Sequence, residues 1–404
     1  MRRLRVSDKP VLLTVGGHTL RRLWEPLSET YDLAFLQTQA AQMAESMGLP
    51  AIALERLLAA EMVAESKTQA MIATTEIVNA AKGGTVSFDA EVPELHNDGL
   101  LTWLPPMFYD HMVTSLARLH AMEAFAKTRK IAGVLVHEDV TPEGRLLVEF
   151  GKANGIPTLH IPHANHYIKP GTSDIHCQIE ADYLGVAGEY MRDWYLACGA
   201  DPERVTVLGT PQYDYLYDLD TLPGYEAARR AFHVPEGKKV VGYGTSWHQM
   251  TSVWGDGTAE LGRCWASVLS ASQVMDAFLM VHVHYGEPPE RQQHYADQMK
   301  EASVKGAVHR GDGLFWSLMA SDVVVVPSAS NYGLEAAILG KPVVELWTPG
   351  ARFPKDGPEG TWGEALVEVI ERAKPLPDWA KRMNAYPDAT DRSVEWVKGK
   401  CLSQ

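Results

Sequence analysis

The sequence has few cysteines, no long apolar run and fewer basic than acidic residues. Its four cysteines, among 404 residues, are widely spaced and include no CxxC pair, so we predict neither a disulfide framework nor a cysteine-bound zinc. No segment reaches the roughly 18 consecutive apolar residues of a membrane span, and the basic residues 1–5 are not followed by the apolar core of a signal peptide. We therefore expect a cytoplasmic protein without a transmembrane segment.

The charge balance limits the class of partner. Lys and Arg total 37 against 51 Asp and Glu, a net charge of −14, which argues against binding a polyanion over the whole surface. A local basic pocket remains compatible with this total. The composition, 46% hydrophobic and 22% charged, is that of a folded globular protein, and the length corresponds to about two or three domains of roughly 100–200 residues.

Short apolar runs alternate with helix-sized segments, which is the pattern of a parallel α/β sheet. Residues 11–15 form the first run and lead through Gly16 and Gly17 into a helical segment at 19–27. Apolar residues at helical spacing follow at 37–81 and 107–127. Further strands are predicted at residues 133–136, 156–161, 183–186 and 205–208, and then at 239–243, 277–283, 304–309, 322–326 and 342–346.

A boundary between domains is predicted near the middle of the chain. Residues 218–238 hold two prolines and two glycines around a short helical piece, as connections between domains often do. We therefore predict two Rossmann-like α/β domains, at residues 1–217 and 239–374. A helical tail at 375–404 is expected to pack back across the first domain.

One segment, residues 320–344, carries the most specific motif. A predicted buried strand ends in small hydroxyl residues and a helix follows, so Ser328, Ser330, Asn331 and Gly333 place backbone N–H groups at a helix N-terminus, where a phosphate binds well. Glu335, in the helix, can accept hydrogen bonds from ribose hydroxyls. The alternative is a capped helix, with Ser330 as N-cap and Glu335 as a first-turn partner of the helix dipole.

Histidines form a second group of candidates. His163 and His166 follow one predicted strand and His284 follows another, and open parallel sheets bind ligands at these carboxyl ends. Each histidine taken alone is as well explained as a hydrogen-bonded residue at the edge of the core. His282 and His284 share a strand face, but no acidic residue stands at ligand spacing, so we predict no metal ion.

Four further residues follow predicted strands. Asp139 either orients an acceptor or supports His163, or it is simply an acid at a helix entry. Thr245 and Ser246 follow the first strand of the second domain, where a hydroxyl and backbone amides can hold a phosphate. Arg310 follows the 304–309 strand and is a candidate for the same phosphate.

Several segments in the same order resemble the GT-B superfamily, namely glycosyltransferases and their relatives the UDP-N-acetylglucosamine 2-epimerases and CDP-glycerol glycerophosphotransferases. The segment 320–344 resembles their nucleotide-binding stretch. Asp139 with Gly144-Arg145, followed by Pro162-His163, resembles the first-domain pattern of an acid after one strand and a histidine after the next. The likeness covers residues 131–347 and includes segments 155–158, 181–182, 188–189, 199–205 and 208–214.

The resemblance implies two Rossmann-like domains that face each other across a cleft, with a nucleotide-activated sugar such as a UDP-sugar held by the second domain. It implies transfer to a hydroxyl of a glycan or other acceptor, with His163 as general base and His284 on the donor phosphates. Gly17, His18 and His166 are placed on the acceptor side. His18 stands where the family has arginine, so only its position is carried over. No cofactor is implied.

Other functions on the same fold stay open. An epimerase or hydrolase would convert the donor without an acceptor, although the acid pair and arginine of the epimerases are absent from residues 168–174. A non-catalytic nucleotide-sugar binding protein would keep Ser330 and Glu335 but would not need His163. A net charge of −14 argues against nucleic acid as the acceptor. The sequence leaves the sugar, the nucleotide, the acceptor, homodimer formation and peripheral membrane contact undecided.

Overall fold

The computed structural model describes residues 8–82, 98–164, 177–246, 257–311, 313–327, 330–346 and 365–402, with single residues 358, 361 and 363. The chain divides into two compact units. One comprises residues 1–163, 178–185 and 393–404, and the other comprises residues 164–177 and 186–392.

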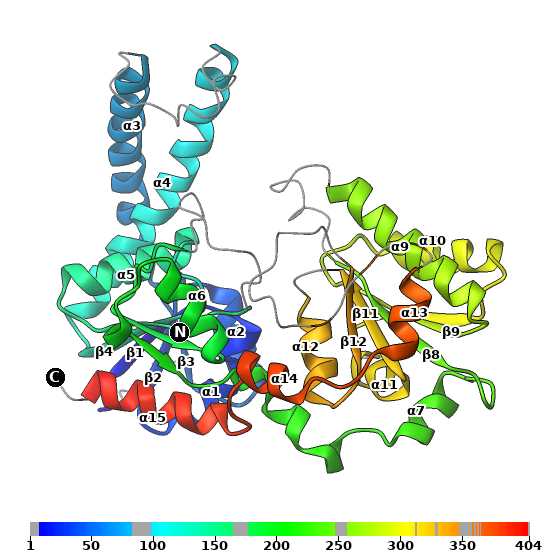
Figure 1. Cartoon of the computed structure of the whole chain (residues 1–404). Coiled ribbons are helices and arrows are strands. Elements are labelled where there is room, and N and C mark those ends of the chain that lie inside the picture. Colours follow the sequence, from blue (N-terminus) through cyan, green and yellow to red (C-terminus); the bar gives the residue numbers. More distant parts are fainter. Residues whose placement is uncertain are drawn as a thin grey trace. The chain divides into compact units, whose positions relative to one another are not determined.

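Strands from the first half of the described chain form one sheet, in the order β3-β2-β1-β4-β5-β6-β7 (Figure 1). The pairs from β3 through to β6 are parallel. The chain moves outward from β1 to β3 and then returns to the other side of β1 with β4, so the order reverses between β1 and β4. Ligands of open α/β sheets bind at such a switch point, outside the carboxyl ends of the strands. The strands are β1 (Val11–Thr14), β2 (Asp32–Phe35), β3 (Ala51–Ala53), β4 (Ile131–Val136), β5 (Thr158–His160), β6 (Tyr183–Val186) and β7 (Val205–Val207).

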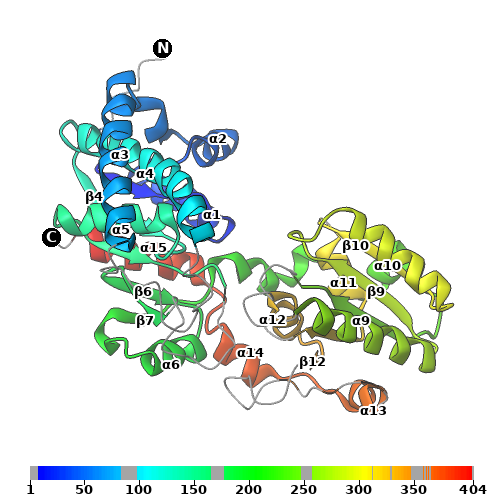
Figure 2. The ribbon, with the colours of Figure 1, turned by 90° about the horizontal axis from the view of Figure 1, so that it is seen from above.

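Helices cover this sheet because their apolar stripes need a partner. Leu13, Val134, Val136 and Leu147 are completely buried in the core between sheet and helices. Two long helices, α3 and α4, lie side by side, with the Thr74 hydroxyl 3.9 Å from the Met112 sulfur (Figure 2). The helical elements are α1 (His18–Ser28), α2 (Thr38–Ser46), η1 (Leu54–Leu57), α3 (Ala60–Lys82), α4 (Asp98–Ala126), α5 (Pro142–Ala153), α6 (Glu189–Ala197), η4 (Pro202–Arg204), η5 (Pro211–Tyr217) and η6 (Leu219–Thr221).

Residues 37–81, whose apolar spacing predicts helix throughout, are interrupted by the edge strand β3. Helix α2 ends at Ser46. Gly48, just beyond its C-cap, has a positive φ of 81°, and the Leu49 amide donates a hydrogen bond back to the Ala44 carbonyl. Pro50 then prevents the helix from resuming. The apolar residues that follow pair with β2 instead.

The second sheet has the order β10-β9-β8-β11-β12, and each of its pairs is parallel. Its switch point lies between β8 and β11. Val241, Leu279, Val281 and Val325 are completely buried in its core. The strands are β8 (Val240–Gly244), β9 (Phe278–Val283), β10 (Gly306–Arg310), β11 (Val323–Pro327) and β12 (Val343–Leu346). The helices are α7 (Tyr225–Ala231), α9 (Gly257–Val274), α10 (Glu290–Glu301), α11 (Leu314–Ala320), α12 (Asn331–Ile338), α13 (Ala365–Arg372) and α14 (Pro377–Met383).

The last helix, α15 (Ala389–Leu402), returns to the first sheet, which confirms the predicted packing of the tail (Figure 1). The Lys400 ammonium lies 4.0 Å from the centre of the Tyr183 ring on β6, and Cys401 is buried. The Asp214 carboxylate accepts hydrogen bonds from the amides of Ala389 (3.0 Å) and Thr390 (2.7 Å) at the start of the helix. A negative charge at a helix N-terminus is favourable, so Asp214 anchors the tail.

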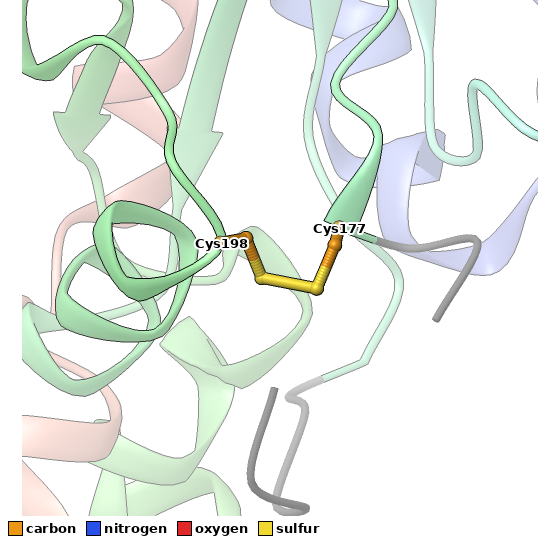
Figure 3. The surroundings of a disulfide bond; sticks show 2 residues. All are labelled: Cys177 and Cys198. Carbon is orange, nitrogen blue, oxygen red and sulfur yellow. A yellow bond between two sulfur atoms is a disulfide. The ribbon is translucent and has the colours of Figure 1, made fainter. Parts of the chain in front are cut away.

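The expectation of no disulfide is wrong, because Cys177 and Cys198 form one, with Cα atoms 5.1 Å apart (Figure 3). Cys198 follows α6, and spacing alone does not reveal that this helix end meets Cys177. Cys264 and Cys401 are free and buried. Disulfides persist mainly in oxidising compartments, so the cytoplasmic location stays a prediction. Among the described helices, none has both the length and the apolar character needed to cross a membrane.

Breaking this disulfide is expected to lower the free energy of unfolding. The two cysteines are 21 positions apart, and a crosslink that closes a loop of this length contributes about 3 kcal/mol by restricting the unfolded chain. Urea unfolding with and without dithiothreitol measures the difference. Cys198→Ser is the control, because reductant should not change its midpoint. An equal midpoint for the untreated and the reduced wild-type protein would contradict the expectation.

Candidate functional site

The switch point of the first sheet brings together residues that follow β1, β4 and β5. Gly17, before α1, packs against His137, and a Cβ at Gly17 would stand 2.8 Å from the His137 ring nitrogen. Glycine is therefore required for this close approach. The rings of His137 and His163 meet edge to face, with centroids 6.0 Å apart. Gly17 and His163, both candidates from the sequence, thus lie at the same edge of the sheet.

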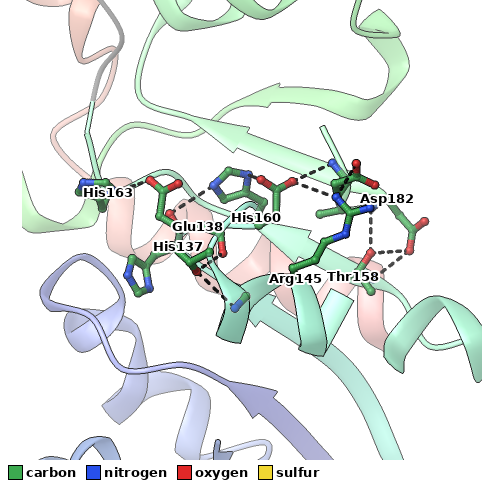
Figure 4. Close-up of polar contacts among 12 residues, drawn as sticks. His137, Glu138, Arg145, Thr158, His160, His163 and Asp182 are labelled. Carbon is green, nitrogen blue, oxygen red and sulfur yellow. Dashed lines mark hydrogen bonds and ion pairs between the residues drawn. The ribbon is translucent and has the colours of Figure 1, made fainter. Parts of the chain in front are cut away.

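His163 has a carboxylate partner, Glu138, which directly follows His137. Its Nδ1 atom contacts Oε1 of Glu138 (Figure 4). The Glu138 side chain is 9% exposed, whereas the His163 side chain is 40% exposed. In a neutral ring whose Nδ1–H donates to the carboxylate, Nε2 keeps a lone pair and can accept a proton. Such a carboxylate also orients the ring and stabilises the imidazolium that forms. The pair therefore has the arrangement that a histidine general base requires.

Asp139, the acid predicted from the sequence as a candidate, contacts a different histidine. It is 2% exposed, its Oδ2 accepts hydrogen bonds from the amides of Glu180 (2.8 Å) and Ala181 (3.1 Å), and its Oδ1 lies 3.4 Å from Nδ1 of His160. Burial raises the pKa of Asp139, but the hydrogen bond and charge of His160, together with the two amides, outweigh it and lower the pKa to about 2.

Two of the three roles first considered for Asp139, support of His163 and the acid at a helix entry, do not match these contacts. The N-cap of α5 is Thr141, whose hydroxyl accepts from the Gly144 amide at 3.3 Å, so Asp139 is not the acid at that helix entry. The carboxylate on His163 belongs to Glu138. In the bend that follows β4, the side chains of these two adjacent acids contact different histidines, Glu138 contacting His163 and Asp139 contacting His160. The sequence contained both acids but no signal for which one faces His163.

At the second switch point, between β8 and β11, helix α12 begins. Ser330 is its N-cap residue, and its hydroxyl makes no capping hydrogen bond. The Gly333 amide was expected to be available to a phosphate. It instead donates a hydrogen bond to the Ser330 carbonyl at 3.1 Å. Gly333 instead permits close packing, because a Cβ there would lie 2.9 Å from a Val326 methyl group of β11. Asn331 is the first residue of the helix and is partly buried.

Glu335 lies beyond the first turn of α12, so it is not the first-turn dipole partner. It is partly buried, and burial raises the pKa of its carboxyl to about 8. Within the described residues, no hydrogen bond or ion pair reaches this carboxyl. Its acceptor oxygens are thus available for hydroxyl groups of a ligand.

The His284 ring is held in one tautomer after β9. Its Nδ1 accepts a hydrogen bond from the Gly286 amide at 3.0 Å, so in the neutral ring Nε2 carries the proton. Burial is the largest influence on the pKa of His284 and lowers it. The charge of Glu287 raises this pKa and the charge of Arg310 lowers it, and the net shift is downward. His284 is therefore a neutral N–H donor near pH 7.

Thr245 is buried and holds the backbone at His284. Its hydroxyl donates to the buried Glu287 carboxylate and accepts the His284 amide at 2.8 Å, so it has no proton left for a phosphate. Ser246, the next residue, is partly buried. The Arg310 guanidinium donates to the Tyr285 carbonyl and brings positive charge to this strand edge.

His282 belongs to the core of the second sheet. Its Nδ1 lies 3.3 Å from Nδ1 of His309, and its ring stacks on Tyr332 with centroids 5.2 Å apart. Burial lowers the pKa of His282 to about 3 and that of His309 to about 4, so both rings are neutral. In the described ranges, no three His, Cys, Asp or Glu side chains are arranged to hold a metal ion. Ser328, His166 and the side chain of His18 lie outside the described residues.

Comparison with known proteins identifies the fold. No protein-family model and no curated protein sequence matches the chain. Solved structures similar to it include the UDP-GlcNAc 2-epimerase of Methanocaldococcus jannaschii (12% identity, TM-score 0.56, covering 96% of this chain and 99% of that one). They also include the UDP-GlcNAc 2-epimerase of Neisseria meningitidis bound to UDP-GlcNAc (13%, 0.54, 98% and 100%) and MurG of Acinetobacter baumannii (10%, 0.51, 97% and 99%). At these identities the likeness concerns the fold alone, and the chain has the two-Rossmann fold of the GT-B proteins, as the resemblance implied.

Proposed function

We propose that the chain is a glycosyltransferase that uses a nucleotide-activated sugar, or a similar nucleotide diphosphate donor, to modify an acceptor hydroxyl. The observation that carries the proposal is the Glu138–His163 pair at the switch point of the first sheet. An activated donor needs a nucleophile, and a partly exposed histidine that is paired with a carboxylate through Nδ1 can deprotonate a hydroxyl with Nε2.

The second sheet is the proposed donor site. Glu335 accepts hydrogen bonds from the ribose hydroxyls, and the Nε2–H of His284 donates to a phosphate oxygen. Arg310 and the N-terminus of α12 offset the charge that develops on the nucleotide diphosphate as it leaves. This scheme requires no metal ion.

The transfer step follows from these roles. The acceptor oxygen bonds to the sugar carbon while the bond from that carbon to the diphosphate oxygen breaks. Nε2 of His163 takes the hydroxyl proton, Glu138 stabilises the imidazolium, and the nucleotide diphosphate departs with the bonding electron pair. Orientation of the two substrates and charge stabilisation supply the acceleration.

Epimerisation is a second candidate, because two of the similar structures are UDP-GlcNAc 2-epimerases, one of them bound to UDP-GlcNAc. An epimerase changes the sugar without an acceptor. A hydrolase would release the nucleotide diphosphate without one, and a binding protein would do neither.

A single assay separates these functions. The protein is incubated with a panel of nucleotide sugars, UDP-GlcNAc first, with and without glycan, polyol and duplex DNA acceptors. Proton NMR follows the sugar configuration, and chromatography follows free nucleotide diphosphate. Acceptor-dependent release supports the transferase, and an epimer without acceptor supports the epimerase. Release without acceptor indicates a hydrolase, and thermal stabilisation without any product indicates a binding protein.

Glu335→Ala is expected to weaken nucleotide diphosphate binding about tenfold to a hundredfold at pH 9, where the wild-type carboxyl is charged, and less at pH 7. The lost hydrogen bonds to a charged group contribute about 1.5–3 kcal/mol. Ribose hydroxyls favour the charged carboxylate, so wild-type affinity should rise as the pH increases through about 8, where Glu335 ionises. Calorimetry at pH 7 and pH 9 measures both effects.

The matched control for this variant is Glu368→Ala on α13, whose side chain is 75% exposed and should leave the affinity unchanged. Circular dichroism checks that Glu335→Ala is folded. Wild-type affinity in Glu335→Ala would remove this residue from the donor site.

A further inference from the structure

His160, the last residue of β5, occupies the centre of the polar cluster at the first switch point. The residue is 4% exposed. Its Nε2 lies 3.2 Å from the carbonyl oxygen of His137, and its Nδ1 lies 3.4 Å from Oδ1 of Asp139 (Figure 4). A carbonyl can only accept, so Nε2 must carry a proton. A proton on Nδ1 as well places a cation against the Asp139 carboxylate.

The charge of the cluster favours this doubly protonated ring. Burial lowers the pKa of His160, but the hydrogen bond and charge of Asp139 raise it, followed by the charge of Glu138 and the His137 carbonyl, and the net shift is upward. These are the groups that face the ring. Both ring nitrogens of His160 therefore lie against acceptors of the segment that follows β4, and the charges around the ring favour its protonated form.

This segment is anchored on its far side. The Asp139 carboxylate holds the amides of Glu180 and Ala181, which lead into β6. The Glu180 side chain is itself paired with Arg145 of α5 at 2.6 Å. A continuous set of contacts thus runs from β6 through Asp139 and His160 to the His137 carbonyl.

Glu138 stands between the two groups that His160 holds. The ring contacts the backbone of the residue before it and the side chain of the residue after it. The Glu138 side chain contacts His163. Because His160 holds the residues on both sides of Glu138, it restricts the movement of the Glu138 backbone. A displacement of about 1 Å in a catalytic group can reduce a rate about a hundredfold.

We infer that His160 is a positioning residue for the proposed general base. By binding the His137 carbonyl and the Asp139 carboxylate at once, it keeps Glu138 in place and thereby fixes the orientation and tautomer of His163. This inference rests on the proposed function for its effect on rate, but the orientation of His163 can be measured without any turnover.

The first experiment is therefore ¹⁵N NMR of histidine-labelled wild-type protein across pH 5–10. His160 should carry both ring protons at pH 7, and His163 should carry its proton on Nδ1. When His160 loses a proton at alkaline pH, the His163 ring nitrogens should shift with the same midpoint. A neutral His160 at pH 7, or a His163 signal that ignores the titration of His160, would overturn the inference. Both outcomes are independent of whether the protein is a transferase.

The second experiment uses the variants His160→Gln, Glu138→Gln and the double variant with a donor that is turned over. Glutamine keeps one N–H donor but no charge. We expect kcat of His160→Gln to fall about a hundredfold with unchanged donor Kd, and the alkaline decline of kcat to disappear. In the Glu138→Gln background, His160→Gln should reduce kcat only slightly further, since both changes disturb the same Glu138–His163 contact. Additive losses with an unchanged pH profile would assign His160 a structural role only.

Discussion

His163→Ala should lose about 10²–10⁴-fold in single-turnover rate while it binds the donor with wild-type affinity. General-base catalysis commonly contributes this much. The residue belongs to the first sheet, whereas the nucleotide is assigned to the switch point of the second. Its side chain is 40% exposed, so its removal should leave the fold intact. Rapid-quench measurements give the rate, and calorimetry gives the donor Kd.

Two variants test whether the effect belongs to this residue. His166→Ala removes the neighbouring histidine in the sequence and should retain most of the rate. Glu138→Gln keeps the shape of the contact but removes the negative charge, so we expect it to show part of the loss. If His163→Ala turns over at a near-normal rate, the assignment of the base is wrong, and a large loss in His166→Ala would transfer it to that residue.

Asp139→Ala is expected to lower the free energy of unfolding by about 3–5 kcal/mol. It leaves the buried His160 cation without its counter-charge and the amides of Glu180 and Ala181 without an acceptor. Removing one partner of a buried ion pair has an effect of this size. Urea unfolding at pH 5.5 measures it. The control is Asp388→Ala, which removes a half-exposed ion pair with Arg392 and should change the free energy by less than about 1 kcal/mol.

The pH of this measurement follows from the two pKa shifts. The pKa of Asp139 is lowered from 3.8 to about 2, so its contribution is present above 3.8 and is lost as the pH falls through about 2. The pKa of His160 is raised above 6.5, so its contribution is present below 6.5 and is lost as the pH rises through the raised value. Between these limits both charges are present. A cost below about 1 kcal/mol at pH 5.5 would show that the pair adds little to stability.

The alternation of apolar runs predicted all the strands of the second sheet and most strands of the first. Residues 183–186 and 277–283 were expected as strands, and the structure has Tyr183–Val186 and Phe278–Val283. Two strands were overlooked. One is β2 (Asp32–Phe35), and the other is β3, which is three residues long and stands at the sheet edge. Its apolar residues also fit the helical spacing around them, so only pairing with β2 distinguishes it.

The candidate site was predicted less completely than the fold. That His163 and Gly17 share a sheet edge follows from the carboxyl ends of parallel strands. Glu138 and His160 were missed, because a histidine inside an apolar strand and an acid beside another acid have no distinctive local pattern. Thr245 was placed correctly after β8, but its hydroxyl is used by Glu287, which stands 42 positions away.

By itself, the sequence determined most of the order of strands and helices and the strand ends at which His163 and His284 stand, because these depend on residues close together in the chain. Only the tertiary structure decided that Glu138 rather than Asp139 contacts His163, and that Cys177 meets Cys198. The first contact joins residues 25 positions apart and the second joins residues 21 apart. Such pairings depend on the order of the strands in the sheet and on which way each side chain faces, and neither is recorded in the local pattern of residues.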